Sequence, residues 1–145
     1  MHSEIREQPF EPYAELLKYQ QAMQATGHYG ATAVFVGSMR DINEDETVTA
    51  MELEHYPGMT EKYLHTLGEQ AAARWDLIDS LILHRVGRVE PDDAIVLVAV
   101  WSAHRKDAFE ASRYLMEELK SRAPFWKKEQ TAEGERWVEN NTAGY

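Results

Sequence analysis

The sequence contains no cysteine. This absence excludes disulfide bonds, thiolate metal sites and a cysteine nucleophile. Long apolar runs are also missing: none approaches the roughly 18 residues that a membrane-spanning helix requires, and the first four residues are mostly polar. The sequence therefore predicts neither a signal peptide nor a membrane span, and we expect a cytoplasmic protein.

Basic residues are scarce, with 15 Lys and Arg against 25 Asp and Glu, for a formal net charge of −10. Because general nucleic-acid binding needs a broad basic surface, this balance argues against nucleic acid as a partner. The 145 residues are 43% hydrophobic and 28% charged, which is typical of a soluble globular protein. We expect a single domain over residues 1–145 that is large enough to bury a core.

Hydrophobic periodicity and turn residues predict the secondary structure. The expected strands cover residues 5–10, 31–39, 47–56, 80–86, 94–101, 125–130 and 135–138, and the expected helices cover residues 12–27, 60–74 and 103–122. We expect the strand at 31–39 to be central and to form a hairpin with 47–56. Strands that pair mainly with chain neighbours indicate an α+β fold, with a mainly antiparallel sheet and helices packed on it.

One segment is basic within this acidic chain. Residues 105–128 hold seven Lys or Arg against four acidic residues, a local charge of +3, which leaves −13 elsewhere. Such a segment is typical of a site for a small anion; the alternative is a solvated helix face with ordinary ion pairs. The helix in this segment should begin after a Ser102 cap and present an apolar stripe to the core, formed by Ala108, Phe109, Ser112, Leu115, Met116 and Leu119.

Lys120 and Lys127 are the basic residues whose type matters most. Pro124 lies between them and ends the helix, so the chain can turn back and bring both amines to one pocket. Arg122 and Lys128 lie nearby, and like charges lower the pKa of a lysine toward the range useful for proton transfer or nucleophilic attack. The alternative is a pair of exposed lysines beside an apolar wedge.

Three further residues could hold an anion. Arg40 follows the strand at 31–39, where its guanidinium could bind an anion or simply pair with Asp41. His104 and Arg105 lie in the first turn of a helix, whose free N–H groups favour an anion. Lys120 lies about 24 Å further along the helix axis. Either there are two separate sites, or the first turn of one subunit completes the pocket around Lys120 of another in a two-fold dimer.

The histidines and acidic turns do not predict a metal site. His55 and His65 have no ligand-like spacing with a third donor. Glu90, Asp92 and Asp93 lack the glycine-spaced loop of a calcium site, so a solvated turn is expected there.

Several motifs are similar to one known family. They are Ser102-Ala103-His104-Arg105, Leu119-Lys120 and residues 122–129 (RAPFWKKE), preceded by Phe35-Val36-Gly37 with Arg40-Asp41, residues 53–59 (LEHYPGM) and His84-Arg85-Val86-Gly87. In type and order they resemble the large, catalytic subunit of molybdopterin synthase, the MoaE family. The resemblance covers residues 30–138, although Ser38 and Met39 differ from the basic residue expected after Gly37.

The resemblance implies an α/β hammerhead-type fold, a homodimer and a sulfurtransferase of molybdenum cofactor biosynthesis. The substrate would be a cyclic pyranopterin monophosphate (precursor Z), which receives two sulfurs to become molybdopterin. The sulfur would come from the thiocarboxylated Gly-Gly tail of a small ubiquitin-like subunit, in a heterotetramer and without a cofactor. A cysteine-free chain cannot itself carry a persulfide, which agrees with an external donor.

The resemblance also implies roles for individual residues. Lys120 and Lys127 would be catalytic, Lys120 either in acid–base chemistry or in stabilising a carbanion or alkoxide, and Lys127 in stabilising the thiocarboxylate and its adducts; the sequence does not assign the individual steps to either lysine. The tail would pair with residues 125–129 in strand fashion. His104 and Arg105 would reach across the dimer interface. The implied substrate-binding residues are Ser38, Met39, Arg40, His104, Arg105, Lys120, Lys127, Lys128 and Glu129.

Two other functions stay open from the sequence. One is a non-enzymatic module that docks a ubiquitin-like Gly-Gly tail. The other is an unrelated enzyme that acts on a phosphorylated metabolite without a protein partner.

Overall fold

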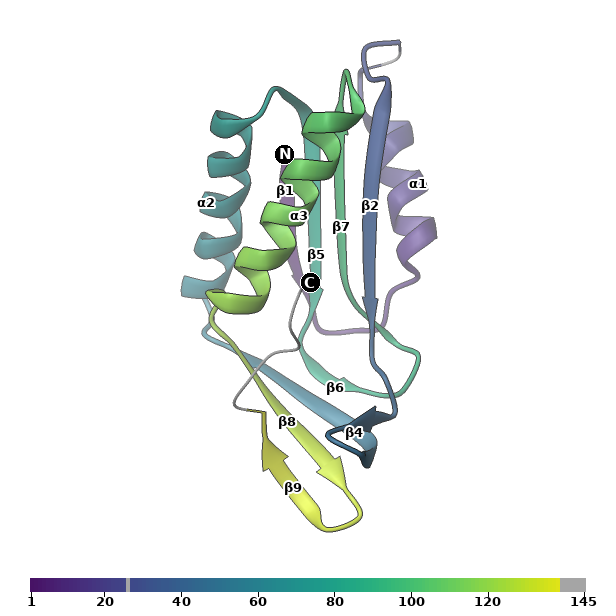
Figure 1. The fold of residues 1–145 in the computed structure, drawn as a ribbon, viewed down its shortest axis with the longest axis vertical. Coiled ribbons are helices and arrows are strands. Elements are labelled where there is room, and N and C mark those ends of the chain that lie inside the picture. Colours follow the sequence, from purple (N-terminus) through teal and green to yellow (C-terminus); the bar gives the residue numbers. More distant parts are fainter. Residues whose placement is uncertain (26, 139–145) are drawn as a thin grey trace.

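The computed structural model describes residues 1–25 and 27–138, which form two sheets and three helices (Figure 1). In chain order the elements are β1 (His2–Arg6), α1 (Pro12–Ala22), β2 (Ala31–Ser38), β3 (Ile42–Asn43), β4 (Glu46–His55), α2 (Met59–Arg74), β5 (Leu77–Arg85), β6 (Gly87–Val89), β7 (Ala94–Ser102), α3 (Arg105–Ser121), β8 (Phe125–Thr131) and β9 (Gly134–Trp137).

The first sheet has the strand order β1-β5-β7-β2. β1 pairs with β5 in parallel, whereas the β5–β7 and β7–β2 pairs are antiparallel. β5 and β7 carry the longest buried runs, residues 80–86 and 96–102, because helices cover both faces of these central strands.

Each face of this sheet has its own apolar core. Helices α2 and α3 cover one face and α1 covers the other, as Figure 1 shows. The first core includes Leu64, Leu67, Ile82, Val98, Val100, Ala111 and Leu115, and the second includes Leu16, Tyr19, Leu81, Leu83, Leu97 and Trp101. Alternation along β5 and β7 thus sends successive side chains to opposite cores.

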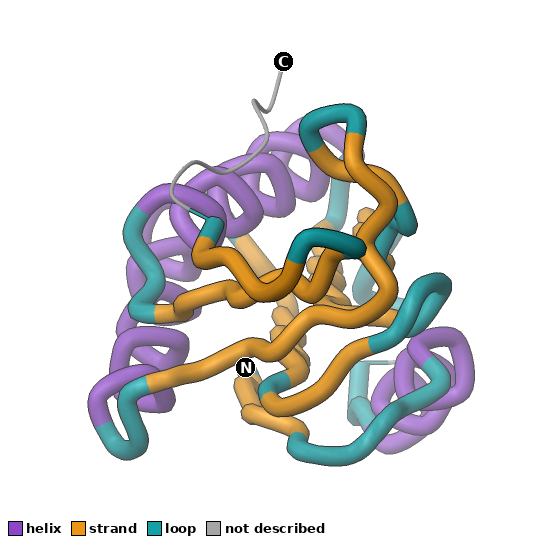
Figure 2. Tube along the Cα trace, turned by 90° about the horizontal axis from the view of Figure 1, so that it is seen from below, coloured by secondary structure: helices purple, strands orange, loops and turns teal. Residues whose placement is uncertain are grey.

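The second sheet lies at one end of the first and is built on the long strand β4 (Figures 1 and 2). It has the order β3-β4-β8-β9, and β6 also pairs with β4. A small core of Met39, Val48, Leu53 and Val89 lies under it. β8 therefore continues directly from the first layer, where α3 ends, into the second sheet.

The α+β class, the mainly antiparallel pairing and the three helices are confirmed, but several details of the prediction are wrong. β2 lies at the edge of its sheet and not at the centre, since Val34 and Phe35 remain 40% and 42% exposed. β4 forms no hairpin with β2, because the chain crosses into the second sheet at β3. The first strand covers 2–6 instead of 5–10.

Two predicted features of α3 are also wrong. His104 occupies the N-cap position, and Ser102 does not cap the helix, since its hydroxyl donates to the His104 carbonyl at 2.5 Å. Phe109 is 67% exposed, whereas Ala111 takes the buried position on the core stripe. The stripe is therefore narrower at the start of the helix, where α3 presents an aromatic ring to solvent.

No helix in residues 1–25 and 27–138 is long and apolar enough to cross a membrane.

Candidate active site

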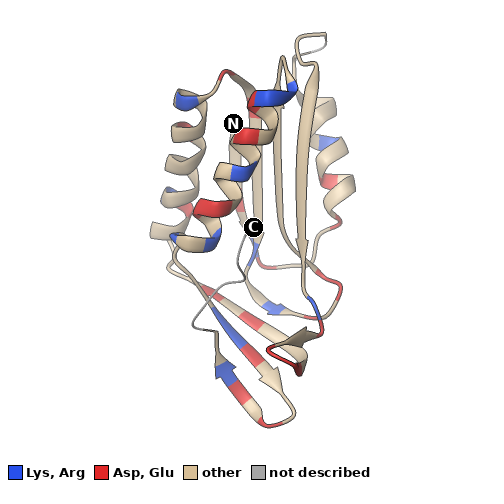
Figure 3. Ribbon diagram, in the orientation of Figure 1, with Lys and Arg blue, Asp and Glu red and all other residues tan. Residues whose placement is uncertain are grey.

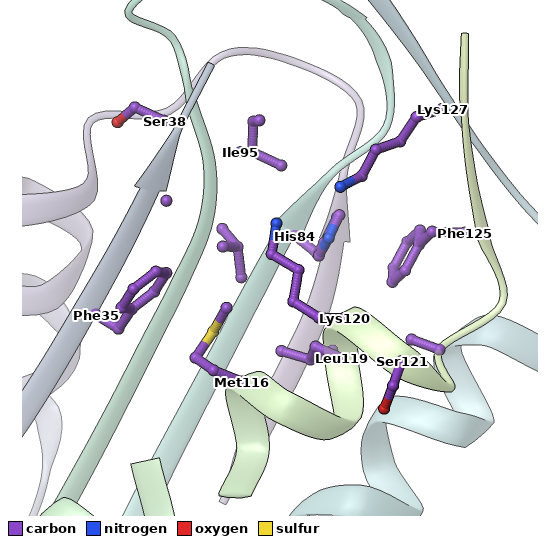
Figure 4. Close-up of a pocket in the computed structure, with 13 residues that line it drawn as sticks. Phe35, Ser38, His84, Ile95, Met116, Leu119, Lys120, Ser121, Phe125 and Lys127 are labelled. Carbon is purple, nitrogen blue, oxygen red and sulfur yellow. The ribbon is translucent and has the colours of Figure 1, made fainter. Parts of the chain in front are cut away.

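A cavity of about 190 Å³ lies where the C-terminal end of α3 meets the first sheet and β8 (Figure 4). Its polar lining comes from Ser38, His84, Lys120, Ser121 and Lys127. Its apolar wall is formed by Phe35, Ile95, Val96, Met116, Leu119, Ala123 and Phe125. The cavity thus combines an apolar wall with convergent cationic groups, as sites for small anionic metabolites do.

Lys120 and Lys127 reach this cavity from different elements, α3 and β8. The helix ends at Ser121, and β8 leaves at Phe125, so the turn at 122–124 brings the two side chains together. The pKa of Lys127 is lowered to about 8, first by burial and then by the charge of Lys120 and a hydrogen bond between the two side chains. Lys127 can therefore exchange a proton near neutral pH.

His84 is a cavity residue that was not predicted. It lies on the face of β5 that carries Ile82, and its ring stacks on Phe125 with centroids 3.8 Å apart. Burial lowers the pKa of His84 to about 4, with the charges of Lys127 and Lys120 acting in the same direction. The sequence did contain a signal for this residue, because His84 is a histidine in an otherwise apolar strand. Alternation along the strand places it on the same face as Ile82.

The start of β8 is fixed to α2. The Thr60 hydroxyl donates to the Pro124 carbonyl at 3.1 Å and accepts the Tyr56 N–H at 2.9 Å. Thr60 is not the predicted helix cap, since α2 begins at Met59 and the Glu61 carboxylate accepts the Gly58 N–H. Thr60 instead fixes the turn that separates the two lysines.

Glu129 is a buried structural residue of the hairpin β8–β9. It is 3% exposed, and its carboxylate accepts the Asn43 amide at 3.0 Å and Arg136 Nε at 3.2 Å. Arg136 also pairs with Glu46 at 3.1 Å and donates to the Asn43 carbonyl. Glu129 lies on the same face of β8 as Lys127. The negative charge of Glu129 raises the pKa of Lys127. Its contact with the cavity is thus electrostatic.

Lys128 points to the opposite face of β8. Its Nζ lies 2.7 Å from the Glu135 carboxylate and 5.4 Å from the centre of the Trp137 ring. Glu135 raises the pKa of Lys128. The structure therefore separates Lys128 from the cavity that holds Lys127.

The predicted residues 38–40 have three different environments. Ser38 lines the cavity, whereas the Met39 side chain is buried with Val48 and Leu53 in the small core. The Met39 backbone N–H donates to the Asp93 carbonyl, and the Met39 carbonyl accepts the Asp92 N–H, so the backbone of Met39 is tied to the turn at 90–93. Arg40 is exposed, directly after β2.

His104 and Arg105 lie at the opposite end of α3 from the cavity, and both are exposed. The 16 residues from His104 to Lys120 correspond to about 24 Å of helix. Within one chain, the structure does not bring these residues to the lysines.

Only part of the basic segment 105–128 faces the cavity. Arg113 pairs with Glu117 at 2.7 Å and Arg122 with Glu118 at 3.4 Å. Figure 3 shows basic and acidic residues alternating along α3 and the hairpin β8–β9. The outer face of α3 is thus a solvated helix face with ordinary ion pairs, which was the alternative interpretation of the basic segment. Lys120, in contrast, lines the cavity. In the described part of the chain, no group of three His, Asp or Glu is placed to hold a metal ion.

Residues 5–122 match the family model described as MoaE protein. The chain belongs to the MoaE family. The match covers most of the chain and includes Lys120, while Lys127 lies just beyond its end.

Curated relatives carry the name molybdopterin synthase catalytic subunit. The protein from Ralstonia nicotianae is 61% identical over 110 residues, which are 76% of this chain and 62% of that protein. The protein from Haemophilus influenzae is 49% identical over 135 residues, 93% of this chain and 87% of that protein. The prediction of a MoaE-family enzyme of molybdenum cofactor biosynthesis is therefore confirmed.

Solved structures agree in fold. A molybdopterin synthase structure from Staphylococcus aureus matches with a TM-score of 0.83 and 33% identity, over 94% of this chain and 96% of that chain. A complex of subunits 1 and 2 of molybdopterin-converting factor from Helicobacter pylori matches with a TM-score of 0.77 and 22% identity, over 97% of this chain and 92% of that chain. The second match supports the shared fold alone.

Proposed function

We propose that this MoaE-family chain inserts two sulfurs into a cyclic pyranopterin monophosphate, using the thiocarboxylated C-terminus of a small ubiquitin-like subunit as donor. The observation that carries the proposal is the lysine pair, in which Lys127 has a pKa lowered to about 8 beside Lys120 in a cavity of about 190 Å³. A cavity with an apolar wall and two adjacent amines suits a reaction that creates and removes negative charge.

The two amines have different chemical roles in this proposal. Lys127 is largely buried, and its lowered pKa suits it to accept and return a proton as sulfur replaces oxygen. Lys120, on the exposed side of the helix end, supplies a cation that stabilises the oxyanion of each adduct. Of the alternatives left open by the sequence, this assignment gives Lys120 the stabilising role, because burial lowers the pKa of Lys127.

The donor tail has a shorter docking edge than expected. β8 pairs with β4 along its length, and β9 occupies its other edge from Lys128 to Thr131. The Lys127 carbonyl also accepts the Val138 N–H at 2.8 Å. Strand pairing with a tail is therefore confined to Phe125 and Trp126, next to the cavity. The Helicobacter pylori match, a complex of two subunits, is consistent with such a partner.

A homodimer would complete the site with His104 and Arg105 of a second copy. Both residues are exposed at the start of α3, and Phe109 beside them is 67% exposed. The edge strand β2 also exposes Val34 and Phe35. An exposed apolar surface of this kind is typical of an interface, and a two-fold axis there would form two equivalent sites.

The decisive experiment is turnover with purified components: this chain, the pterin phosphate and a thiocarboxylated small subunit, with dithiolene product measured. We expect Lys120→Ala and Lys127→Ala each to lower the rate by about 10²–10⁴-fold. The matched control is Lys62→Ala, an exposed lysine of α2, which should leave the rate unchanged.

Other outcomes would point to other functions. No product from the unaltered chain with intact partner would overturn the proposal. Binding of the small subunit without any effect of the lysine substitutions on turnover would favour a docking module. Failure to recover a Gly-Gly-ended protein, with turnover of a phosphorylated metabolite by this chain alone, would favour the unrelated enzyme.

A further inference from the structure

The cavity contains one polar ring, that of His84, to which the proposed chemistry assigns no role. The ring is held on two sides. Its face stacks on Phe125 with an interplanar angle of 11°, and its Nδ1 lies 2.8 Å from the Arg85 carbonyl oxygen. The imidazole therefore has a defined orientation before any ligand enters.

The Nδ1 contact also defines the tautomer. A carbonyl oxygen can only accept a hydrogen bond, so Nδ1 must carry the proton. In a neutral imidazole the other nitrogen, Nε2, is then an acceptor with a free lone pair. Since Nδ1 is directed to the backbone of β5, Nε2 is the polar ring atom left for the cavity that His84 lines.

The surroundings of the ring keep it neutral. Burial lowers its pKa to about 4, and the charges of Lys127, Lys120 and His55 lower it in the same direction. These three charges act on the ring from β8, α3 and β4. Glu129, also on β8, raises the pKa of Lys127. The paired positions on the neighbouring strands, Ile5 and Val96, carry no charge.

We infer that His84 is a positioning residue of this site, a neutral imidazole whose Nε2 accepts a hydrogen bond from the protonated lysine pair in the cavity. This inference deepens the proposed function, on which its biological meaning rests. An acceptor on one side of the lysine pair directs the remaining N–H bonds of the amines toward the bound ligand. His84 takes no proton in this arrangement, because its lowered pKa leaves the ring neutral at pH 7.

The test measures proton binding in the unaltered chain and two variants, without substrate. Lysine side-chain ¹³C and ¹⁵N resonances, assigned with Lys120→Arg and Lys127→Arg, report the titration of Lys127. We expect His84→Phe, which keeps a stacking ring but has no acceptor, to lower the Lys127 pKa by about one unit, since the ammonium loses a hydrogen-bond partner. His84→Gln supplies a hydrogen-bond acceptor again, so the Lys127 pKa in this variant should lie close to that of the unaltered chain.

Each alternative has a distinct result. Equal shifts in the Phe and Gln variants would show that only packing matters and would overturn the inference. An upward shift in His84→Phe would mean that the native ring is cationic, which would also overturn it. Histidine ¹⁵N spectra of the unaltered chain should show the proton on Nδ1; a proton on Nε2 would refute the inference even if a variant does not fold. If these NMR results are as expected but the unaltered chain forms no product in the turnover experiment, only the proposed function is overturned.

Discussion

At the scale of single residues, burial acts in the same direction on two of the ionisable groups that line the cavity, His84 and Lys127. His84 and Lys127 are both weaker bases in the folded chain, since each would carry its charge in a poorly solvated place. The result is a cavity with fewer fixed charges than its composition suggests. Composition alone counts Lys127 as a full cation at neutral pH, whereas a pKa of about 8 leaves a neutral fraction available.

The depressed pKa of His84 predicts a specific loss of stability in acid. The pKa falls from 6.5 to about 4 on folding, so between these values the unfolded chain binds more protons than the folded chain. The stability that depends on neutral His84 is complete above pH 6.5 and is lost as the pH falls toward 4. The difference is about 3 kcal/mol.

Urea denaturation at pH 7 and pH 4.5 measures this effect. His84→Phe should lose about 2–3 kcal/mol less than the unaltered chain over this interval, because no imidazole remains to be protonated. His65→Gln, at an exposed position of α2, should behave like the unaltered chain. Equal acid sensitivity of all three chains would contradict the lowered pKa of His84.

At the scale of elements, the hairpin β8–β9 depends on one buried carboxylate. Glu129→Gln keeps the shape of the side chain but removes the charge that Arg136 and Asn43 face. We expect a loss of about 1–3 kcal/mol in the free energy of unfolding and faster amide hydrogen exchange in residues 125–137. The Lys127 pKa should fall further, because Glu129 raises it in the native chain.

The control for this prediction is Glu133→Gln in the turn of the same hairpin. Its side chain is exposed, and only its backbone N–H bonds the Thr131 hydroxyl. It should leave both stability and exchange unchanged. A hairpin that tolerates Glu129→Gln equally well would show that the other β8–β9 contacts are sufficient.

Most elements could be predicted from the sequence, whereas their partners could not. Pro124 and the apolar periodicity correctly predicted that a helix ends shortly before a strand with two lysines nearby. Pairing of β4 with β8 joins residues about 75 positions apart, and no local pattern predicts such a register. Alternation along the strand could have given the face of His84, but its contact with Phe125 could not be predicted, because the two residues are distant in sequence.

At the scale of the whole molecule, the proposed dimer predicts complementation between two inactive chains. Lys120→Ala and Arg105→Ala would each disable both sites of a homodimer. In a mixed dimer, one site has both defects and the other has none. Random mixing should therefore restore about a quarter of the unaltered rate, measured as product formation after the two chains are unfolded and refolded together.

The control is mixing each variant with itself, which should restore nothing. Chains that never complement, although mixed dimers form, would place the whole site within one chain and assign His104 and Arg105 to a separate function.

The two lysines of the cavity belong to different layers, Lys120 to a helix on the first sheet and Lys127 to a strand of the second. Their separation therefore depends on the angle between the layers, and the repulsion between their charges depends on that separation. Any displacement of the hairpin β8–β9 relative to α3 would therefore change how readily Lys127 gives up its proton.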